Sequence, residues 1–247
     1  MELKDFFEVH NKVALGFSGG VDSVYLLYAA VKYGADVAPY YVSTQFQPEF
    51  ELNDAKKAAN LIGAELRIIN YDILQHSDIT MNTADRCYYC KRKLFNAIIR
   101  QAAEDGYTTV IDGTNASDIE GDRPGMKALK ELEVLSPLRE CGITKETIRE
   151  LSKEADLFTW DKPAYACLAT RIPEGDKITS DKLSRIERAE NVLFKRGFTD
   201  FRIRLFHSAA RIQLPDEQMD KMIGMRNEIL SELEPYFDTI FLDLKGR

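Results

Sequence analysis

The feature that most constrains the fold is the stretch GFSGGVDS, Gly16 to Ser23, which joins an apolar, β-branched run to a helical pattern. The run KVALGFS before and within it predicts a buried strand, and Val21 to Tyr33 places apolar residues at helical spacing. Glycines at 16, 19 and 20 let backbone N–H groups turn inward without a side-chain clash. Because a helix N-terminus adds partial positive charge, the junction favours a phosphate group.

This loop differs from the two common nucleotide-binding loops. No Gly-Lys-Ser/Thr follows the glycines, as the nucleoside-triphosphatase loop requires, and the dinucleotide pattern Gly-x-Gly-x-x-Gly is absent. From the residues alone, the alternative is a glycine turn that only connects a strand to a helix.

Strand and helix patterns alternate through the first half of the chain, which indicates a parallel sheet covered on both faces. In such sheets, ligands bind beyond the carboxyl ends of the strands. The expected strands are Lys12–Ser18, Asp36–Thr44, Glu65–Tyr71, Tyr107–Thr114 and a fifth within Glu133–Cys141, and the expected helices are Val21–Tyr33, Asp54–Ile62, Arg92–Asp105 and Gly125–Glu131.

The pattern changes after residue 176, where a compact α+β unit is expected. We therefore predict an α/β domain over 1–176 and a small α+β domain over 177–247 that binds substrate or mediates oligomerisation. The second domain's expected elements are a helix from Asp181 to Arg196 capped by Thr179 or Ser180, strands Asp200–Phe206 and Ala209–Pro215, a helix from Pro215 to Leu233, and a last strand in Phe237–Gly246.

Composition narrows the class of protein. The 247 residues carry a formal net charge of -7, which argues against broad binding to nucleic acid. No apolar run approaches the roughly 18 residues that a membrane helix needs, and the start lacks the basic and apolar regions of a secretory signal. Four cysteines without such a signal are typical of cytosolic thiols or ligands. We expect a cytoplasmic protein with no membrane and no nucleic-acid partner.

The pair Cys87 and Cys90 has a spacing that several functions share. Cys-x-x-Cys occurs in redox couples, in metal or cluster sites and at unremarkable positions near a helix start. The spacing alone leaves all three interpretations open.

The motif Ser-Gly-Gly-x-Asp-Ser resembles the PP-loop of the ATP pyrophosphatase superfamily, whose domain is the parallel-sheet, adenine nucleotide alpha hydrolase-like fold. The resemblance implies cleavage of ATP between the α and β phosphates, with Asp22 helping to hold Mg²⁺. Thr44, at the end of the second strand, would lie near adenine, and Asp112–Asp118 would approach the phosphates or metal. A plain Asn/Asp-rich loop is the alternative for the latter segment. The implied ATP-binding residues are Gly16, Ser18, Gly19, Gly20, Asp22, Ser23, Thr44 and Gly113.

A sharper resemblance rests on further stretches that occur in the order CYYCKRKLF, DGTNASD, SPL, GITKETIR, PAYACLATRIPEGDKIT, FRIRLFHSAARI and FDTIFLDLKG. Together with the loop, they are similar to the LarE family of ATP-dependent sulfur transferases over essentially the whole chain. The piece beginning at Cys167, CLATRIP, is the most specific. The resemblance implies sulfur insertion into a pyridinium-3,5-dicarboxylate mononucleotide, a step in making the nickel pincer cofactor.

In the chemistry that this resemblance implies, ATP adenylates a substrate carboxylate and the Cys167 thiolate displaces AMP. β-Elimination would then leave the sulfur on the substrate and dehydroalanine in the chain. Arg171, four residues on, would lower the cysteine pKa or hold the substrate phosphate. Outside the motif, a lone cysteine in a Pro/Ala-rich loop is often only a small buried residue.

Arginines in the small domain suit an anionic substrate. Arg202 and Arg204 share one face of a strand because side chains alternate, and Arg211 lies across the turn. Guanidinium groups on one face suit the substrate phosphate, and a solvated strand face is the alternative. The family pattern has Glu where this chain has Gln213, which puts a metal site in this domain in doubt. His207, in the turn, is a weaker phosphate candidate.

The family resemblance also bears on the cysteine pair. Some relatives add a Cys-x-x-Cys at the position of Cys87 and Cys90, and three thiols including Cys167 suit a [4Fe-4S] cluster with one open iron that passes on hydrosulfide. A structural zinc ion would need a fourth protein ligand. Cys141 is a candidate for it, but we interpret Cys141 rather as a buried residue without a metal-binding role. The family also forms homo-oligomers.

Two other functions are weighed against this one. A tRNA-thiolating PP-loop enzyme would show a basic surface or an RNA-binding appendage, and the chain is acidic. A non-catalytic ATP-binding or sulfur-storage protein would carry a broken loop, whereas Ser18, Gly19, Gly20, Asp22 and Ser23 are all present.

Overall fold

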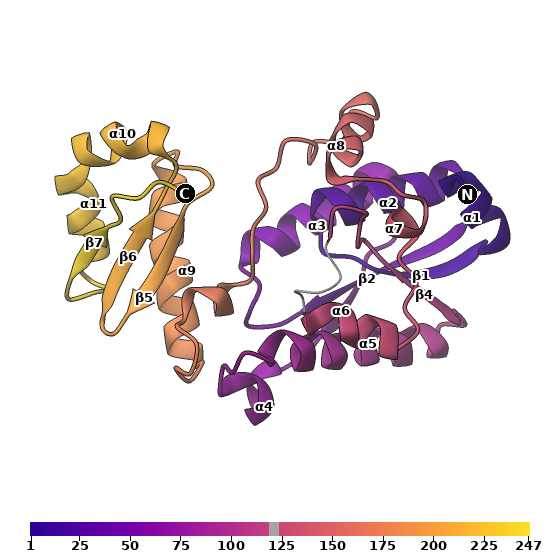
Figure 1. The fold of residues 1–247 in the computed structure, drawn as a ribbon, viewed down its shortest axis with the longest axis horizontal. Coiled ribbons are helices and arrows are strands. Elements are labelled where there is room, and N and C mark those ends of the chain that lie inside the picture. Colours follow the sequence, from indigo (N-terminus) through magenta and orange to yellow (C-terminus); the bar gives the residue numbers. More distant parts are fainter. Residues whose placement is uncertain (119–123) are drawn as a thin grey trace. The chain divides into compact units, whose positions relative to one another are not determined.

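The computed structural model describes residues 1–118 and 124–247. These residues form two compact units (Figure 1). Unit 1 consists of Met1–Ile73 and Asp85–Lys162, and unit 2 consists of Leu74–Ala84 and Pro163–Arg247. The sequence-based division after residue 176 thus falls inside unit 2, whose C-terminal segment begins at Pro163.

Unit 1 is built on a four-stranded, all-parallel sheet, as the alternating pattern predicts. The strand order is β3-β2-β1-β4, so the first strand of the chain lies in the interior of the sheet. The strands are β1 (Lys12–Gly16), β2 (Asp36–Ser43), β3 (Arg67–Asn70) and β4 (Thr109–Asp112). The α/β fold class is confirmed.

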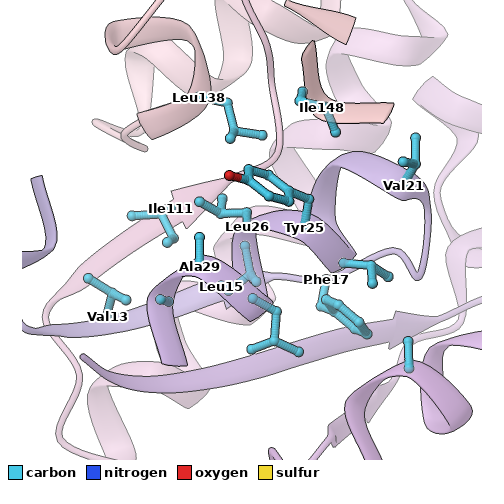
Figure 2. Close-up of a cluster of buried hydrophobic side chains, with 14 of the residues drawn as sticks. Val13, Leu15, Phe17, Val21, Tyr25, Leu26, Ala29, Ile111, Leu138 and Ile148 are labelled. Carbon is cyan, nitrogen blue, oxygen red and sulfur yellow. The ribbon is translucent and has the colours of Figure 1, made fainter. Parts of the chain in front are cut away.

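In the part of unit 1 that the structure describes, five helices pack on one face of this sheet, and the larger of the two hydrophobic core clusters lies between them and the sheet. The helices on this face are α1 (Leu3–Val9), α2 (Val21–Lys32), α3 (Glu49–Ile62), α7 (Pro137–Glu140) and α8 (Lys145–Glu154). Figure 2 shows Leu15 of β1, Leu26 of α2 and Ile148 of α8 within the same cluster. Burial of these apolar side chains fixes α2, and with it the glycine loop, at the end of β1.

The opposite face carries α5 (Arg86–Glu104) and α6 (Pro124–Glu131). Phe95 and Ile98 of α5 pack with Leu129 of α6 against Ala14 and Tyr40 of the sheet. The sequence pattern places the start of α5 at Arg92, but the helix begins at Arg86 and includes both members of the Cys-x-x-Cys pair.

The expected fifth strand in residues 133–141 is wrong. Only Leu135 forms an isolated parallel bridge, to Ile111, and Pro137 then opens the short helix α7. Proline has no N–H to give to a strand ladder, and its fixed φ suits the first helical position. The chain here therefore leaves the sheet after one bridge.

Unit 2 contains a three-stranded mixed sheet in the order β5-β6-β7. Strands β5 (Arg202–Phe206) and β6 (Ala209–Gln213) form the predicted antiparallel hairpin, and β7 (Ile240–Leu242) pairs in parallel with β6. Helix α9 (Ser180–Lys195) packs against β5, and the Thr179 hydroxyl caps it by accepting from the Lys182 amide.

The single helix expected from Pro215 to Leu233 is wrong, because the segment is divided. A 3₁₀ turn (Asp216–Gln218) leads into α10 (Met219–Gly224), and α11 (Arg226–Leu233) follows after Met225. Gly224 ends the first helix, consistent with the low helix propensity of glycine. Further short elements in this unit are α4 (Ser77–Thr80) and a 3₁₀ turn at Leu168–Arg171.

Among residues 1–118 and 124–247, each helix is too short or too polar to cross a bilayer.

Candidate functional site

The glycine loop lies where the sequence predicts, between the end of β1 and the start of α2. The hydroxyl oxygens of Ser18 and Ser23 lie 3.1 Å apart, and the Ser23 hydroxyl donates to the Gly20 carbonyl at 3.2 Å. The Ser18 amide donates to Ser23 Oγ at 3.3 Å. Hydrogen bonds between the two serines therefore join the two ends of the loop, and their hydroxyl groups lie beside the α2 N-terminus.

Close packing explains two of the glycines. Gly19 has a φ of +72°, and a Cβ there would stand 3.0 Å from the Ala55 backbone of α3. A Cβ on Gly113, in the loop after β4, would stand 3.1 Å from the Ser23 amide nitrogen. The segment after β4 thus lies directly against the first turn of α2, at the carboxyl edge of the sheet.

Asp22, in the first turn of α2, is held from two sides. Lys145 at the start of α8 donates from Nζ to Asp22 Oδ2 at 2.5 Å, and Asn115 Nδ2 donates to Asp22 Oδ1 at 3.3 Å. Asn115 lies in the segment that the sequence places near phosphate or metal. Lys145 was missed, and its only sequence signal is its position in GITKETIR.

Asp112, at the end of β4, is buried among hydrogen-bond donors. Its carboxylate accepts from the Thr114 hydroxyl at 2.6 Å and from the Ser136 hydroxyl at 2.7 Å. Lys91 Nζ lies 3.5 Å from Asp112 Oδ2. Since Lys91 follows Cys90 directly, α5 brings its cysteine-bearing end to the same edge of the sheet as the glycine loop.

The end of β2, which the sequence predicts to lie near adenine, is followed by a turn at Thr44. The Thr44 hydroxyl donates to Gln47 Oε1 at 2.6 Å and accepts from the Phe46 amide at 3.1 Å, so this turn is locally ordered. The Tyr41 hydroxyl is buried and has no hydrogen-bond partner among the described residues. Burial raises the pKa of Tyr41, which therefore stays protonated as a donor.

Cys87 and Cys90 both lie within the first five residues of α5. Residues three apart share one face of a helix, so the two thiols face the same way. Cys87 is exposed, Cys90 is half-buried, and the Arg86 guanidinium lies 3.6 Å from Cys87 Sγ. Within residues 1–118 and 124–247, no three His, Cys, Asp or Glu side chains gather into a group that could hold a metal ion. Cys141 packs against the core, and burial raises the pKa of its thiol.

Cys167, in unit 2, directly precedes the 3₁₀ turn Leu168–Arg171. Its carbonyl accepts from the Thr170 hydroxyl at 2.8 Å and from the Thr170 amide at 3.0 Å. The side chain is half-buried. The backbone of this cysteine is thus fixed by its own turn.

Arg171 is one of the most buried side chains in the described chain, 1% exposed, and forms an ion pair with the equally buried Glu190 of α9. Its guanidinium also donates to the Ala166 carbonyl at 2.9 Å, next to Cys167. Tyr165 donates its hydroxyl to Glu190, and the Arg171 guanidinium lies over the Tyr165 ring. Glu190 was not identified from the sequence, because nothing distinguishes it from the other charged residues of the helix predicted over 181–196.

Two arginines of β5, Arg202 and Arg204, also contact the Cys167 loop. Arg202 donates to the Ala164 carbonyl at 2.6 Å, and Arg204 donates to the Thr170 carbonyl at 2.5 Å. Burial, with the nearby Arg171 charge, lowers the pKa of Arg202 to about 10. Burial likewise lowers the pKa of Arg204. Both side chains lie on one face of β5, as the strand pattern predicts.

Arg211 lies directly across from Arg204 in the hairpin. It is half-exposed and pairs with Asp243 at 2.5 Å. Gln213 accepts from Arg204 at 2.7 Å and donates to Asp243 at 2.8 Å, so the residue that departs from the family pattern bridges a cation and an anion. His207 occupies the turn with a φ of +55° and packs edge-on against Phe206.

Comparisons with known proteins give the class first. No protein-family model matches the chain. A tRNA-specific 2-thiouridylase of Pseudothermotoga lettingae is 29% identical over 67% of this chain and 58% of its own length. With the parallel sheet and the glycine loop at the β1–α2 junction, this match places the chain among the PP-loop enzymes, a class that uses ATP with Mg²⁺.

Two longer matches give the family. An uncharacterised protein of Synechocystis is 38% identical over 99% of this chain and 92% of its own length. The pyridinium-3,5-bisthiocarboxylic acid mononucleotide synthase of Lactiplantibacillus plantarum is 31% identical over 96% of this chain and 87% of its own length. The chain belongs to the LarE family, and it is an ATP-dependent sulfur transferase.

Proposed function

We propose that this protein inserts sulfur into a pyridinium-3,5-dicarboxylate mononucleotide, as a step in the synthesis of a nickel pincer cofactor. The name of the Lactiplantibacillus relative, similar over nearly the whole chain, supports this substrate. The observation that carries the proposal is the intact loop at the β1–α2 junction, with Asp22 and two hydroxyls beside a helix N-terminus.

The first step is adenylation of the substrate. A carboxylate oxygen of the pyridinium compound attacks the α-phosphorus of ATP, the bond from that phosphorus to the bridging oxygen breaks, and pyrophosphate leaves. Ser18, Ser23 and the amides of the glycine loop would hold the pyrophosphate, and Asp22 would hold Mg²⁺, which neutralises the leaving group when bound. Thr44 would lie beside adenine, and Gly113, which lies against the Ser23 amide, would let the β4 loop approach the phosphates.

The second step transfers sulfur. The Cys167 thiolate attacks the acyl carbon of the adenylate, AMP leaves, and a thioester joins the substrate to the chain. Loss of the Cys167 Cα proton and cleavage of its Cβ–S bond then release the thiocarboxylate product and leave dehydroalanine. Both steps balance without an oxidant or reductant. Arg171 supports this step by binding the carbonyl beside Cys167 and orienting the loop.

Cys87 and Cys90, together with Cys167, are the proposed ligands of a [4Fe-4S] cluster. Two of the three thiols support the proposal, because Cys87 and Cys90 share one face of α5 and Cys87 is exposed. Such a cluster would supply hydrosulfide from its open iron, so that Cys167 would be spared. Iron and acid-labile sulfide measured after anaerobic purification test the proposal, and both should fall in Cys87→Ser and Cys90→Ser but persist in Cys141→Ser. Equal iron contents in all three variants would contradict it.

The arginine face of the β5–β6 hairpin is proposed to bind the substrate phosphate. Arg211 is half-exposed, and Arg204 lies directly across from it. Arg202 extends the same face, although its guanidinium is deeply buried. Substitution of Arg211 by Met should raise the KM for the mononucleotide with little change in kcat. We also propose, from the family, that the protein is a homo-oligomer, which light scattering on the purified protein would test.

A tRNA-thiolating activity is the second candidate, and the match to a 2-thiouridylase favours it. Release of AMP and pyrophosphate from ATP, measured with the pyridinium mononucleotide and in parallel with unmodified tRNA, distinguishes the two. Release with tRNA alone would overturn the leading proposal.

A further inference from the structure

Lys145 is the side chain at the ATP site for which sequence reasoning gives no role. Its Nζ lies 2.5 Å from Asp22 Oδ2, and about a third of the side chain is exposed. The Lys145 amide donates to Ser117 Oγ at 2.9 Å, in the loop after β4. The lysine therefore connects the start of α8, the β4 loop and the first turn of α2.

The local requirements of helix α8 do not explain why a lysine stands at position 145. Lys145 is the first residue of α8, and a cation at a helix N-terminus is disfavoured by the helix dipole. The Thr144 side chain already caps this helix by accepting from the Thr147 amide. The positive charge of Lys145 is stabilised instead by the Asp22 carboxylate on the neighbouring helix α2.

The start of α8 is held in place independently of this ion pair. The Ala116 amide donates to the Ile143 carbonyl at 2.9 Å, and Ile148 is fully buried in the core. Removal of the Lys145 ammonium group should therefore leave the backbone of α8 where it is. The ion pair is available for a function other than holding the fold.

The single carboxylate of Asp22 would interact with two cations, the Lys145 ammonium group and the proposed Mg²⁺ ion. Asn115 occupies the Oδ1 side and the Lys145 ammonium group the Oδ2 side. A Mg²⁺ ion that binds this carboxylate must compete with the ammonium group. Lysine is a point charge on a flexible four-carbon stem, so its ammonium group is able to swing to a new anion without a backbone movement.

We propose that Lys145 binds the pyrophosphate part of ATP, and that its ion pair with Asp22 is the nucleotide-free arrangement of the same side chain. Before nucleotide binds, its ammonium group neutralises Asp22. With Mg²⁺ and ATP bound, the Asp22 carboxylate would hold the metal and the Lys145 ammonium group would move to the β- and γ-phosphates. Negative charge develops there as the bond from the α-phosphorus to the bridging oxygen breaks. The inference rests on the proposed adenylation function, but it requires neither the sulfur step nor the identity of the acceptor.

The test uses full-length protein and two binding probes that need no turnover. Mn²⁺ binding to the nucleotide-free protein is followed by the loss of the free-ion electron paramagnetic resonance signal, and binding of inorganic pyrophosphate with Mg²⁺ is followed by calorimetry. In Lys145→Met we expect Mn²⁺ to bind several-fold more tightly, because a competing cation is gone. We expect pyrophosphate to bind at least about tenfold more weakly, the scale of one lost charge-assisted contact.

The controls separate this role from a structural one. Lys4→Met removes the same charge from an exposed pair in unit 1 and should change neither affinity. Lys145→Arg keeps the charge and should preserve most of the pyrophosphate affinity. A Lys145→Met protein that binds Mn²⁺ more weakly or equally well would show that the lysine only orients Asp22 and would overturn the proposal, as would unchanged pyrophosphate binding. Failure of the acceptor assignment would show instead as absent AMP release with the pyridinium substrate, while these two affinities would still respond.

Discussion

Arg171 and Glu190 form a buried ion pair in unit 2, with Arg171 Nε 2.8 Å from Glu190 Oε1 and both side chains almost fully excluded from solvent. The pair joins the turn after Cys167 to helix α9. Glu190 also accepts from the Ile203 amide at 3.0 Å, so the same carboxylate fixes the start of β5. This buried carboxylate thus links the turn after Cys167 to both α9 and β5.

Removal of this carboxylate should destabilise the protein. Glu190→Ala leaves the Arg171 guanidinium buried without its counter-charge, and we expect the free energy of unfolding to fall by about 3–5 kcal/mol. Urea denaturation measures it. The double variant Arg171→Met/Glu190→Leu, which removes both charges, should recover much of that loss. A double variant as unstable as Glu190→Ala would contradict the assignment of the cost to the unpaired charge.

The glycine loop should tolerate a methyl group at one glycine but not at its neighbour. Gly19→Ala places a Cβ at a φ of +72° and 3.0 Å from the Ala55 backbone, and the left-handed conformation alone costs about 1–2 kcal/mol. Gly20 has a φ of -80°, and its Cβ would meet only Ser18 Oγ at 3.4 Å. We expect thermal unfolding to show a clearly lower Tm for Gly19→Ala than for Gly20→Ala. Equal values would mean that the loop relaxes around the added methyl.

Much of this arrangement follows from local sequence signals. The strand, glycine loop and helix at residues 12–33, the helix end at Ile62 and the Thr179 cap are confirmed because each depends on residues close together in the chain. The start of α5 was missed because the aromatic and cysteine residues before Arg92 have weak helix propensity, which packing overrides.

The long-range contacts of the site were not predictable in this way. Lys145 reaches Asp22 across 123 residues, and Arg171 reaches Glu190 from a different element. Nothing in the local pattern marks either partner, because an acid or a base in a helix is usually a solvated surface residue. Only the packing of α8 on α2, and of the Cys167 turn on α9, brings these charges together.

Asp22→Asn should abolish most of the adenylation step. The amide keeps the shape of the side chain but removes the negative charge proposed to hold Mg²⁺, and we expect AMP formation to fall on the order of 100-fold or more. Chromatographic measurement of AMP over a range of Mg²⁺ concentrations checks this. Glu8→Gln, which removes an exposed carboxylate in the same unit, serves as the control and should keep wild-type rates. An unimpaired Asp22→Asn protein would remove Asp22 from the proposed mechanism.

The stability of unit 1 should fall at alkaline pH partly through Tyr40. Burial, with the hydrogen bond to Asp105, raises the pKa of Tyr40 to about 12. The folded protein therefore keeps a proton that the unfolded chain loses near pH 10, so this contribution is complete below pH 10 and is lost as the pH rises towards 12. The Tm difference between wild type and Tyr40→Phe should shrink between pH 8 and pH 11. A constant difference would show that Tyr40 titrates normally.

Adenylation of a pyridinium dicarboxylate mononucleotide, followed by sulfur transfer to it, is the activity proposed for this chain. The most direct test combines AMP and pyrophosphate release with the intact mass of the chain after one turnover. We predict release that depends on the pyridinium substrate, accompanied either by loss of one H₂S from a chain that still contains Cys141, Cys87 and Cys90, or by an unchanged mass with iron bound. Release of AMP with unmodified tRNA, and none with the pyridinium mononucleotide, would contradict the account.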